Sequence, residues 1–166
     1  QSLWIYTADC IPILFASLKT GHVAACHAGW KGIRNEIIIK TLKYLQELGS
    51  NPNSIIVAIG PCISMTNYPI GKDVARSILN NWNEKRFGLE NISTQNKDSA
   101  LFKETKNPNK LLFNIRNAAK LQLNGVGLND SQISTCPICT FKEKDKFHSW
   151  RREKAKNSQW SGIISN

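Results

Sequence analysis

Residues 13–26 read ILFASLKTGHVAAC, and this stretch determines the first part of the fold. Two apolar runs flank the polar turn KTG (19–21), and a short gap that contains glycine predicts a β-hairpin. If Leu18 faces His22, the numbers of paired residues sum to about 40. The hairpin therefore has a defined open end, where its two strands meet the rest of the chain.

Two motifs lie outside that open end, TADCIP (7–12) before the hairpin and HAGWKG (27–32) after it. In the predicted register Cys10 faces a position near residue 30, and His27 lies within about three residues of it. A strand rises about 3.3 Å per residue, so the two side chains are close enough to meet. We expect the Cys10 sulfur and the His27 imidazole to converge.

Three interpretations of this pair stay open. Thiolate sulfur and imidazole nitrogen are preferred zinc ligands, and a catalytic zinc site uses three protein ligands and a water. The metal would lower the pKa of that water and supply hydroxide near neutral pH. Alternatively, Cys10 is a nucleophile whose thiolate is held by His27. In the third interpretation Cys10 is a small buried side chain and His27 a turn histidine.

The turn Gly29-Trp30-Lys31-Gly32 follows the histidine directly. Glycines at a helix entrance leave backbone N–H groups open, and the helix dipole favours an anion there. Lys31 adds a full positive charge, so Lys31 and Gly32 are candidate phosphate-binding residues. The alternative is a glycine-rich connection in which Trp30 covers the core.

The rest of the sequence alternates strand and helix patterns. The apolar spacing predicts one helix over 33–48 that ends at Gly49. It predicts a second helix over 72–82 and a third over 112–123, and the third is ended by Gly125 and Gly127. The run IIVAIG (55–60) is typical of a central strand. Strands are also predicted at 2–6, 132–140, 146–153 and 160–165, and a long surface loop at 84–109. This order predicts an α/β fold, a layered α+β sandwich in which a mixed sheet packs against helices.

Length and composition favour one domain over residues 1–166. No apolar run approaches the ~20 residues that cross a bilayer, so we expect no membrane partner.

The net charge is +10, but the most basic stretch, 142–156, also contains three acidic residues, which favours a small anionic substrate over nucleic acid. The five cysteines are too sparse for a disulfide scaffold, and we expect reduced thiols in a cytoplasm. The first residue is Gln1 and the only methionine is Met65, so we expect a fragment that lacks an N-terminal segment.

Four further residues or motifs are weaker candidates. Cys136-Pro137-Ile138-Cys139 has the spacing of half a zinc ribbon, but without a second such pair we expect buried thiols. Asp9 either orients His27 or a metal-bound water, or it caps the local turn. His148 is an alternative metal ligand, and His22 is expected to be solvated.

Five motifs occur together in this chain and carry a specific resemblance. They are TADCIPIL (7–14), HAGWKG (27–32), IGPCI (59–63), CPICT (136–140) and FHSWRR (147–152). In this order they resemble the YfiH-like family, whose members are called laccase-domain or polyphenol oxidoreductase proteins and also purine nucleoside phosphorylases. The resemblance covers nearly the whole chain.

The resemblance implies a fold similar to that of a bacterial toxin deamidase, and one zinc ion bound by Cys10, His27 and a histidine upstream of Gln1. Copper is the alternative metal. Arg151 and Arg152 match the arginine pair of the family near the cleft, and Lys31 replaces the usual arginine of that motif. The implied activities are phosphorolysis of adenosine, inosine and methylthioadenosine, deamination of adenosine, oxidation of phenols, and amide hydrolysis that edits peptidoglycan precursors.

Our main hypothesis is a zinc-dependent enzyme that acts on a purine nucleoside and phosphate, with Cys10 and His27 as ligands and catalytic residues and with Lys31, Gly32 and Arg151 as anion-binding residues. The first rival is a cysteine-dependent amidase or hydrolase with Cys10 as its nucleophile. The second is an inactive domain that binds a partner. Copper oxidase activity ranks last, because the chain lacks His-rich ligand motifs. The sequence does not determine the oligomeric state.

Overall fold

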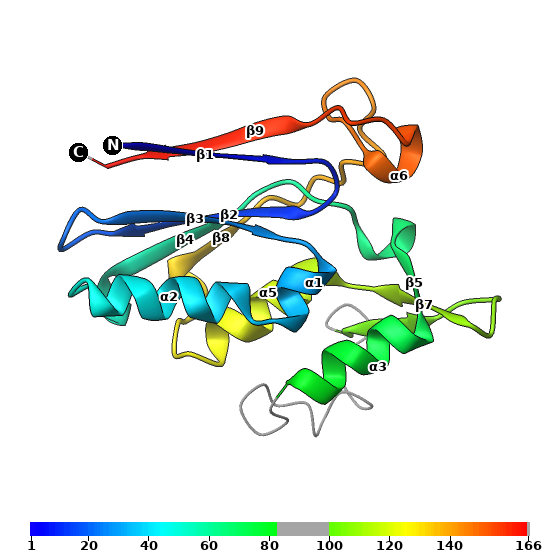
Figure 1. Cartoon of the computed structure of the whole chain (residues 1–166), viewed down its shortest axis with the longest axis horizontal. Helices are drawn as coiled ribbons and strands as arrows, with labels where there is room; N and C mark the ends of the chain where they lie inside the picture. Colours follow the sequence, from blue (N-terminus) through cyan, green and yellow to red (C-terminus); the bar gives the residue numbers. More distant parts are fainter. Residues whose placement is uncertain (83–99, 166) are drawn as a thin grey trace.

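The computed structural model describes residues 1–82 and 100–165 and has three layers (Figure 1). The middle layer is a four-stranded sheet in the order β3-β2-β4-β8. Helices cover one face of this sheet, and a two-stranded ribbon, β1 with β9, lies over the other face. β2 pairs antiparallel with both neighbours, whereas β4 and β8 run parallel. The predicted α/β class, a mixed sheet packed against helices, is confirmed.

The strands are β1 (Ser2–Thr7), β2 (Ile11–Ser17), β3 (Val23–Ala28), β4 (Ile55–Ile59), β5 (Pro69–Gly71), β6 (Phe102–Glu104), β7 (Lys110–Phe113), β8 (Ile133–Thr135) and β9 (Gln159–Ile164). The α-helices are α1 (Trp30–Arg34), α2 (Ile37–Glu47), α3 (Lys72–Asn81), α5 (Ile115–Asn124) and α6 (Trp150–Glu153). Three short 3-10 turns lie at Pro52–Ser54, Met65–Asn67 and Asp130–Gln132. β5, β6 and β7 form a small separate sheet beside α3.

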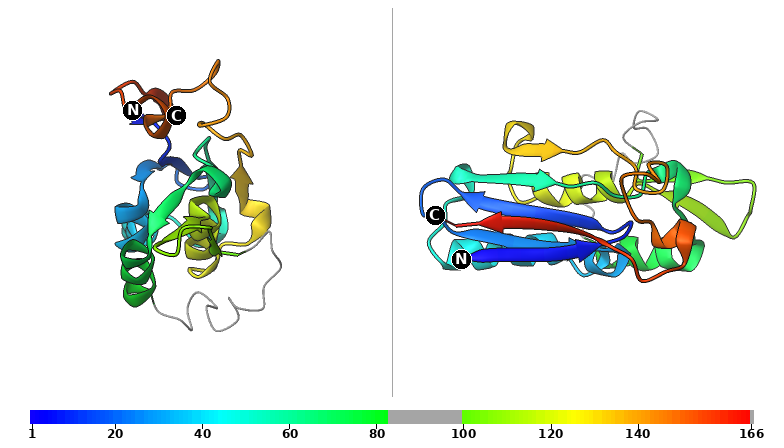
Figure 2. Two further views of the ribbon diagram at one scale, coloured as in Figure 1. Left: turned by 90° about the vertical axis from the view of Figure 1, so that its right-hand side faces the viewer. Right: turned by 90° about the horizontal axis from the view of Figure 1, so that it is seen from above.

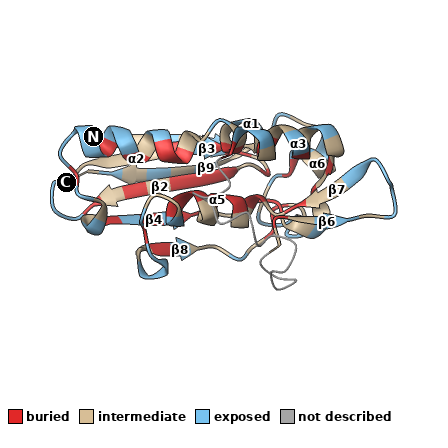
Figure 3. Ribbon diagram, turned by 90° about the horizontal axis from the view of Figure 1, so that it is seen from below, coloured by how far each residue is buried: buried red, intermediate tan, exposed pale blue. Residues whose placement is uncertain are grey.

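The predicted hairpin is confirmed, with its register shifted by one residue. Ile13 pairs with Cys26 and Pro12 with His27, so the paired numbers sum to 39. The shift arises at the turn, where Ser17 closes the hairpin by donating its N–H to the His22 carbonyl. This register directs alternate side chains of β2 into the core between the sheet and the helices, where buried residues concentrate (Figure 3).

The single helix predicted over 33–48 is wrong, because the chain breaks between α1 and α2. Glu36 adopts a left-handed conformation with φ 55°, which interrupts the ladder of helical hydrogen bonds. Ile38, Leu42 and Leu45 are buried as predicted, but Leu48 is 45% exposed. α2 nevertheless ends where expected, at Gly49 with φ 88°.

Of the remaining predicted elements, one helix is confirmed, and the elements whose structure depends on contacts distant in the sequence are wrong in part. The helix expected over 72–82 is confirmed as α3, but the helix expected from 112 begins at Ile115, because residues 110–113 pair with β5 and β6. The predicted loop 84–109 is wrong at β6, and residues 84–99 lie outside the described part. The strand predicted over 146–153 is wrong, since this segment is a loop that ends in α6.

The ends of the described chain lie side by side at one end of the β1–β9 ribbon (Figures 1 and 2). Ser2 pairs with Ile164, and the Gln1 amino group donates to the Ser165 hydroxyl over 3.1 Å. Three aromatic side chains, Trp4, Tyr6 and Trp160, are 58–64% exposed on this ribbon. Among the described residues no helix combines the length and apolarity needed to cross a bilayer.

Replacing Gly49 with alanine should lower the free energy of unfolding by about 1–2 kcal/mol, because a Cβ is disfavoured in the left-handed region. Space does not limit the change, since an added Cβ would meet no heavy atom within 4 Å. Gln46→Ala, at an exposed position in the last turn of α2, is the matched control and should change stability by less than about 0.5 kcal/mol. Urea titration measures both, and equal stabilities would contradict the prediction.

Candidate functional site

The Cys10 side chain lies directly over the backbone of Gly29. Pro12 pairs with His27 and Ile11 with Ala28, so the next opposing positions are residues 10 and 29. A Cβ built on Gly29 would lie only 2.8 Å from the Cys10 sulfur. Glycine at position 29 therefore lets the thiol sit at the end of the hairpin. Burial, together with the neighbouring charge of Asp9, raises the pKa of the Cys10 thiol to about 11.

His27 lies two residues before Gly29, so both face the same side of β3. Successive positions on one face are about 6–7 Å apart along a strand, which brings the imidazole and the Cys10 thiol to the same region. The ring hydrogen-bonds to the Tyr6 backbone, but partial burial is the larger effect and lowers its pKa, so the neutral ring is favoured.

A hollow of about 460 Å³ opens beside the His27 side chain. Its walls come from the end of β1, from Trp150 in α6 and from the loop that leads to β9, and they consist of Tyr6, Thr7, Ala8, His27, Trp150, Ala155, Lys156, Asn157 and Ser158. Cys10 is not part of this wall. The hollow therefore borders the His27 side chain but not the Cys10 thiol, which lies over Gly29.

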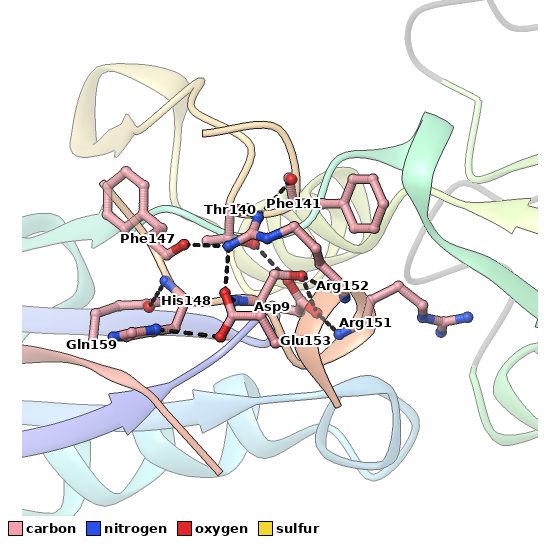
Figure 4. A network of polar contacts seen from close by, with 10 residues as sticks. Asp9, Thr140, Phe141, Phe147, His148, Arg151, Arg152, Glu153 and Gln159 are labelled. Carbon is pink, nitrogen blue, oxygen red and sulfur yellow. Dashed lines mark hydrogen bonds and ion pairs between the residues drawn. The ribbon is translucent and has the colours of Figure 1, made fainter. Parts of the chain in front are cut away.

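A buried carboxylate, Asp9, joins the turn before Cys10 to the C-terminal part of the chain (Figure 4). It accepts hydrogen bonds from the Thr140 hydroxyl at 2.7 Å, the Ser149 hydroxyl at 3.0 Å and the Arg151 backbone N–H at 2.8 Å. Asp9 itself has φ 83°, in the left-handed region. The carboxylate thus anchors two distant segments, and a role in orienting His27 or a metal-bound water stays a prediction.

The two adjacent arginines have different environments. The Arg152 guanidinium donates to the carbonyls of Thr140, Phe141 and Phe147 over 2.6–2.8 Å and pairs with Glu153, so it holds the loop together (Figure 4). The Arg151 guanidinium extends elsewhere: it lies 5.4 Å from the centre of the Tyr68 ring. It donates a hydrogen bond to the Pro69 carbonyl over 3.3 Å.

Tyr68 is a residue that sequence reasoning missed. Its side chain is 8% exposed and packs against Phe113. Burial is the main cause that raises the pKa of its phenol; the charge of Cys10 adds to this, and the Arg151 guanidinium opposes it. The Tyr68 ring therefore lies beside the Arg151 guanidinium and within range of the Cys10 charge. The sequence contains no local signal for this role, because Tyr68 is separated from both partners by more than fifty residues.

Lys31 and Gly32 lie in α1, next to Cys10 and His27. The Lys31 side chain is exposed, with its ammonium 5.7 Å from the centre of the Trp30 ring. A Cβ on Gly32 would lie 3.2 Å from Ile37 and 3.3 Å from the His27 carbonyl, so glycine is needed there for close packing. A phosphate-binding role for these two residues stays a prediction.

The remaining candidate residues lie apart from this pair. The His148 ring pairs with Glu153 at 3.3 Å (Figure 4), and one His22 nitrogen is buried, contrary to the expectation of full solvation. Cys62 and Cys139 pair through a single backbone β-bridge, and the Cys139 sulfur accepts the Ser64 N–H at 3.2 Å. Cys139 is buried, as expected, whereas Cys136 is only partly buried; Cys62 is buried as well.

Cys10 and His27 are donors that suit zinc, but the described residues supply only these two at this place. Within residues 1–82 and 100–165, no group of three or more His, Cys, Asp or Glu side chains could hold a metal ion. A catalytic zinc site uses three protein ligands. A third ligand would have to come from outside the described residues.

Comparisons with known proteins agree with this arrangement of motifs. The family model described as multi-copper polyphenol oxidoreductase laccase matches residues 1–165. A Deinococcus radiodurans protein named purine nucleoside phosphorylase is 36% identical over 98% of this chain and 56% of its own length. A Synechocystis protein of the same name is 32% identical over 99% of this chain and 64% of its own length. In Escherichia coli, the purine nucleoside phosphorylase YfiH is 30% identical over 90% of this chain and 54% of its own length.

Two solved structures share the fold. A Neisseria meningitidis protein superimposes with a TM-score of 0.81 at 26% identity and covers 99% of this chain and 60% of its own. YfiH from Bacillus licheniformis gives a TM-score of 0.80 at 25% identity, with 97% of this chain and 56% of its own covered. The chain thus spans a little over half the length of the proteins it matches.

Asp9→Asn should lower the free energy of unfolding by about 2–4 kcal/mol, because an amide NH₂ would then face donors that need an acceptor. Asp145→Asn, at an exposed carboxylate of the same segment, is the control and should stay within about 0.5 kcal/mol. Chemical denaturation compares the two variants with the wild type. An Asp9→Asn protein as stable as the control would show that the carboxylate does not anchor the segment.

Proposed function

Because the chain belongs to the multi-copper polyphenol oxidoreductase laccase family, we propose that it is the core of a zinc-dependent purine nucleoside phosphorylase. This family is the YfiH-like family that the motifs predicted, so the family prediction is confirmed. Relatives that are 30–36% identical carry the name purine nucleoside phosphorylase, which supports this class of enzyme. The substrates proposed are purine nucleosides, such as adenosine, inosine and methylthioadenosine, and inorganic phosphate.

The observation that carries the proposal is the position of Cys10 and His27 at the end of one hairpin. A cysteine nucleophile needs a lowered pKa, whereas burial raises that of the Cys10 thiol. A metal ion deprotonates a coordinating thiol outright, and the low pKa of the His27 ring keeps a nitrogen lone pair available. These properties favour a metal ligand pair over the cysteine hydrolase.

In the proposed site Cys10 and His27 hold zinc, with a third ligand from the segment expected upstream of Gln1. Bound zinc would supply a Lewis acid beside the reacting groups. Phosphorolysis needs a phosphate oxygen to attack the anomeric carbon of the ribose while the bond to the purine nitrogen breaks. We assign phosphate binding to Arg151 and Lys31, whose cationic side chains attract the anion, and to the turn at Gly32.

Two finer points rest on the resemblance alone. Deamination of adenosine is proposed as a second reaction of the same site, and copper as an alternative metal. The five cysteines are free thiols, which supports the expected reducing, cytoplasmic compartment. The amidase and the inactive partner-binding domain are the outcomes that the following experiments would favour if the proposal fails.

Cys10→Ala and His27→Ala should each reduce phosphorolysis of inosine at least about a hundredfold, because each removes a metal ligand. Release of hypoxanthine and ribose 1-phosphate, measured with zinc present, gives the rate. His148→Ala is the matched control, since its exposed ring pairs with Glu153, and it should stay near wild-type activity. Equal turnover by Cys10→Ala and the wild type would reject the proposal, and metal-independent amide hydrolysis would favour the rival.

The alkylation of Cys10 should depend steeply on pH in chelator-treated protein. Only the thiolate reacts with iodoacetamide, and the pKa of about 11 leaves the thiol protonated at pH 8. The rate should therefore be below that of a small free thiol at pH 8 and rise about tenfold per pH unit below that pKa. Mass spectrometry of the Cys10 peptide measures it; fast alkylation already at pH 7 would instead indicate an activated nucleophile.

A further inference from the structure

The outer edge of β3 has no strand beside it in the part of the chain that the structure describes. β3 is the terminal strand of the order β3-β2-β4-β8, and it pairs only with β2. The Ser17 N–H bonds to the His22 carbonyl, and hydrogen-bonding directions alternate along an antiparallel pair. The backbone groups of Val23, Ala25 and His27 therefore point away from β2, toward the open edge.

This edge lies at the bottom of a slot of about 630 Å³. β1 forms one wall through Leu3, and α2 forms the other. The side chains on the α2 wall recur at helical spacing and consist of Ile37, Lys40, Thr41, Tyr44, Leu45 and Leu48. Tyr44 is 61% exposed and Leu48 45%, so α2 presents two large apolar side chains to the slot that the core does not cover.

β3 carries none of the features that protect natural sheet edges. Such edges are protected by charged side chains, prolines, bulges or a covering segment. The sequence of β3, VAACHA, contains no Lys, Arg, Asp, Glu or Pro. At the end of the slot next to the hairpin turn, the His22 Nδ1 is buried and has no hydrogen-bond partner among the described residues. A covering segment is the one form of protection left for this edge.

The shape of the slot selects the type of occupant. The β3 edge of a second copy would itself be recessed between its own β1 and α2, so two such edges do not fit together. A single extended strand fits, and it would bond to β3 while its side chains alternate toward Leu3 and toward Tyr44. The relatives have further chain that could supply such a strand, because the part matched here is 54–64% of their length.

We propose that the slot along β3 binds one extended, mostly apolar polypeptide strand, equivalent to a segment of the longer relatives outside the part that this chain matches. The strand pairs with the backbone of Val23, Ala25 and His27 and extends the central sheet by one strand. Both of its faces are covered, by β1 and by α2, so its sequence should be continuously apolar. This inference does not depend on the enzymatic activity proposed above.

The test uses short overlapping synthetic peptides that tile the unmatched part of the Synechocystis relative. Residue-resolved amide exchange of this chain is measured with each peptide. One peptide should bind and slow exchange at Val23, Ala25 and His27 by at least about tenfold, because their N–H groups become hydrogen-bonded. Failure of every peptide to protect these amides would overturn the proposal, and so would protection without peptide in a dimer of this chain.

Two test variants and one control variant make the test specific. Ala25→Pro removes an N–H that points toward the open edge and should abolish binding. The hydrogen bonds between β3 and β2 do not use this N–H and are preserved. Thr135→Pro is the matched control on the opposite edge strand: Cys136 donates to Ile59, so the Thr135 N–H points away from β4. It should bind the peptide as the wild type does.

Tyr44→Lys, on the exposed slot wall, should weaken binding without changing the fold. Binding unaffected by Ala25→Pro and Tyr44→Lys would contradict strand addition.

Discussion

The buried carboxylate of Asp9 is the interaction on which the geometry of the site depends. Its three donors come from residues 131 to 142 positions further along the chain. A buried carboxylate is tolerated only when such donors replace the water it loses, and each of these bonds is strengthened by the charge. The carboxylate thereby fixes the sharp turn between β1 and β2, and that turn brings the Cys10 sulfur over Gly29.

The same carboxylate separates the roles of the two arginines. By accepting the Arg151 backbone N–H, Asp9 sets where α6 begins. Arg152 then bonds to three carbonyls of the neighbouring loop, which leaves the guanidinium of Arg151 free to reach the ring of Tyr68. A single anchoring carboxylate thus fixes both the turn that carries the thiol and the start of the helix that carries Arg151. An arginine pair that looks equivalent in the sequence has one member that holds a loop together and one whose guanidinium lies over the ring of Tyr68.

The sequence predicted well what local contacts determine. The hairpin of residues 13–26 was found from turn chemistry, and the meeting of Cys10 with the Gly29 turn follows from its register even after a shift of one residue. The break at Glu36 was missed because a glutamate carries no signal for a left-handed conformation. The strand predicted over 146–153 is wrong because periodicity does not reveal the contact that shapes this segment: Ser149 donates a hydrogen bond to Asp9, 140 positions earlier in the chain. Tyr68 was missed for the same reason.

β3 links the candidate site to the open edge of the sheet. His27 contributes its side chain to the hollow near the thiol, while its backbone belongs to the edge at which we propose strand addition. A strand paired along β3 would therefore end beside Cys10 and His27. The described residues supply only these two ligands, one fewer than a catalytic zinc site uses. The two proposals meet at one residue and yet stay separable, because proline at position 25 would prevent the proposed backbone pairing, whereas removal of the His27 imidazole would remove a proposed metal ligand. An added strand that completed the metal site would tie zinc affinity to the integrity of the sheet edge, and a sheet edge filled without any gain in zinc affinity would show that the third ligand comes from elsewhere.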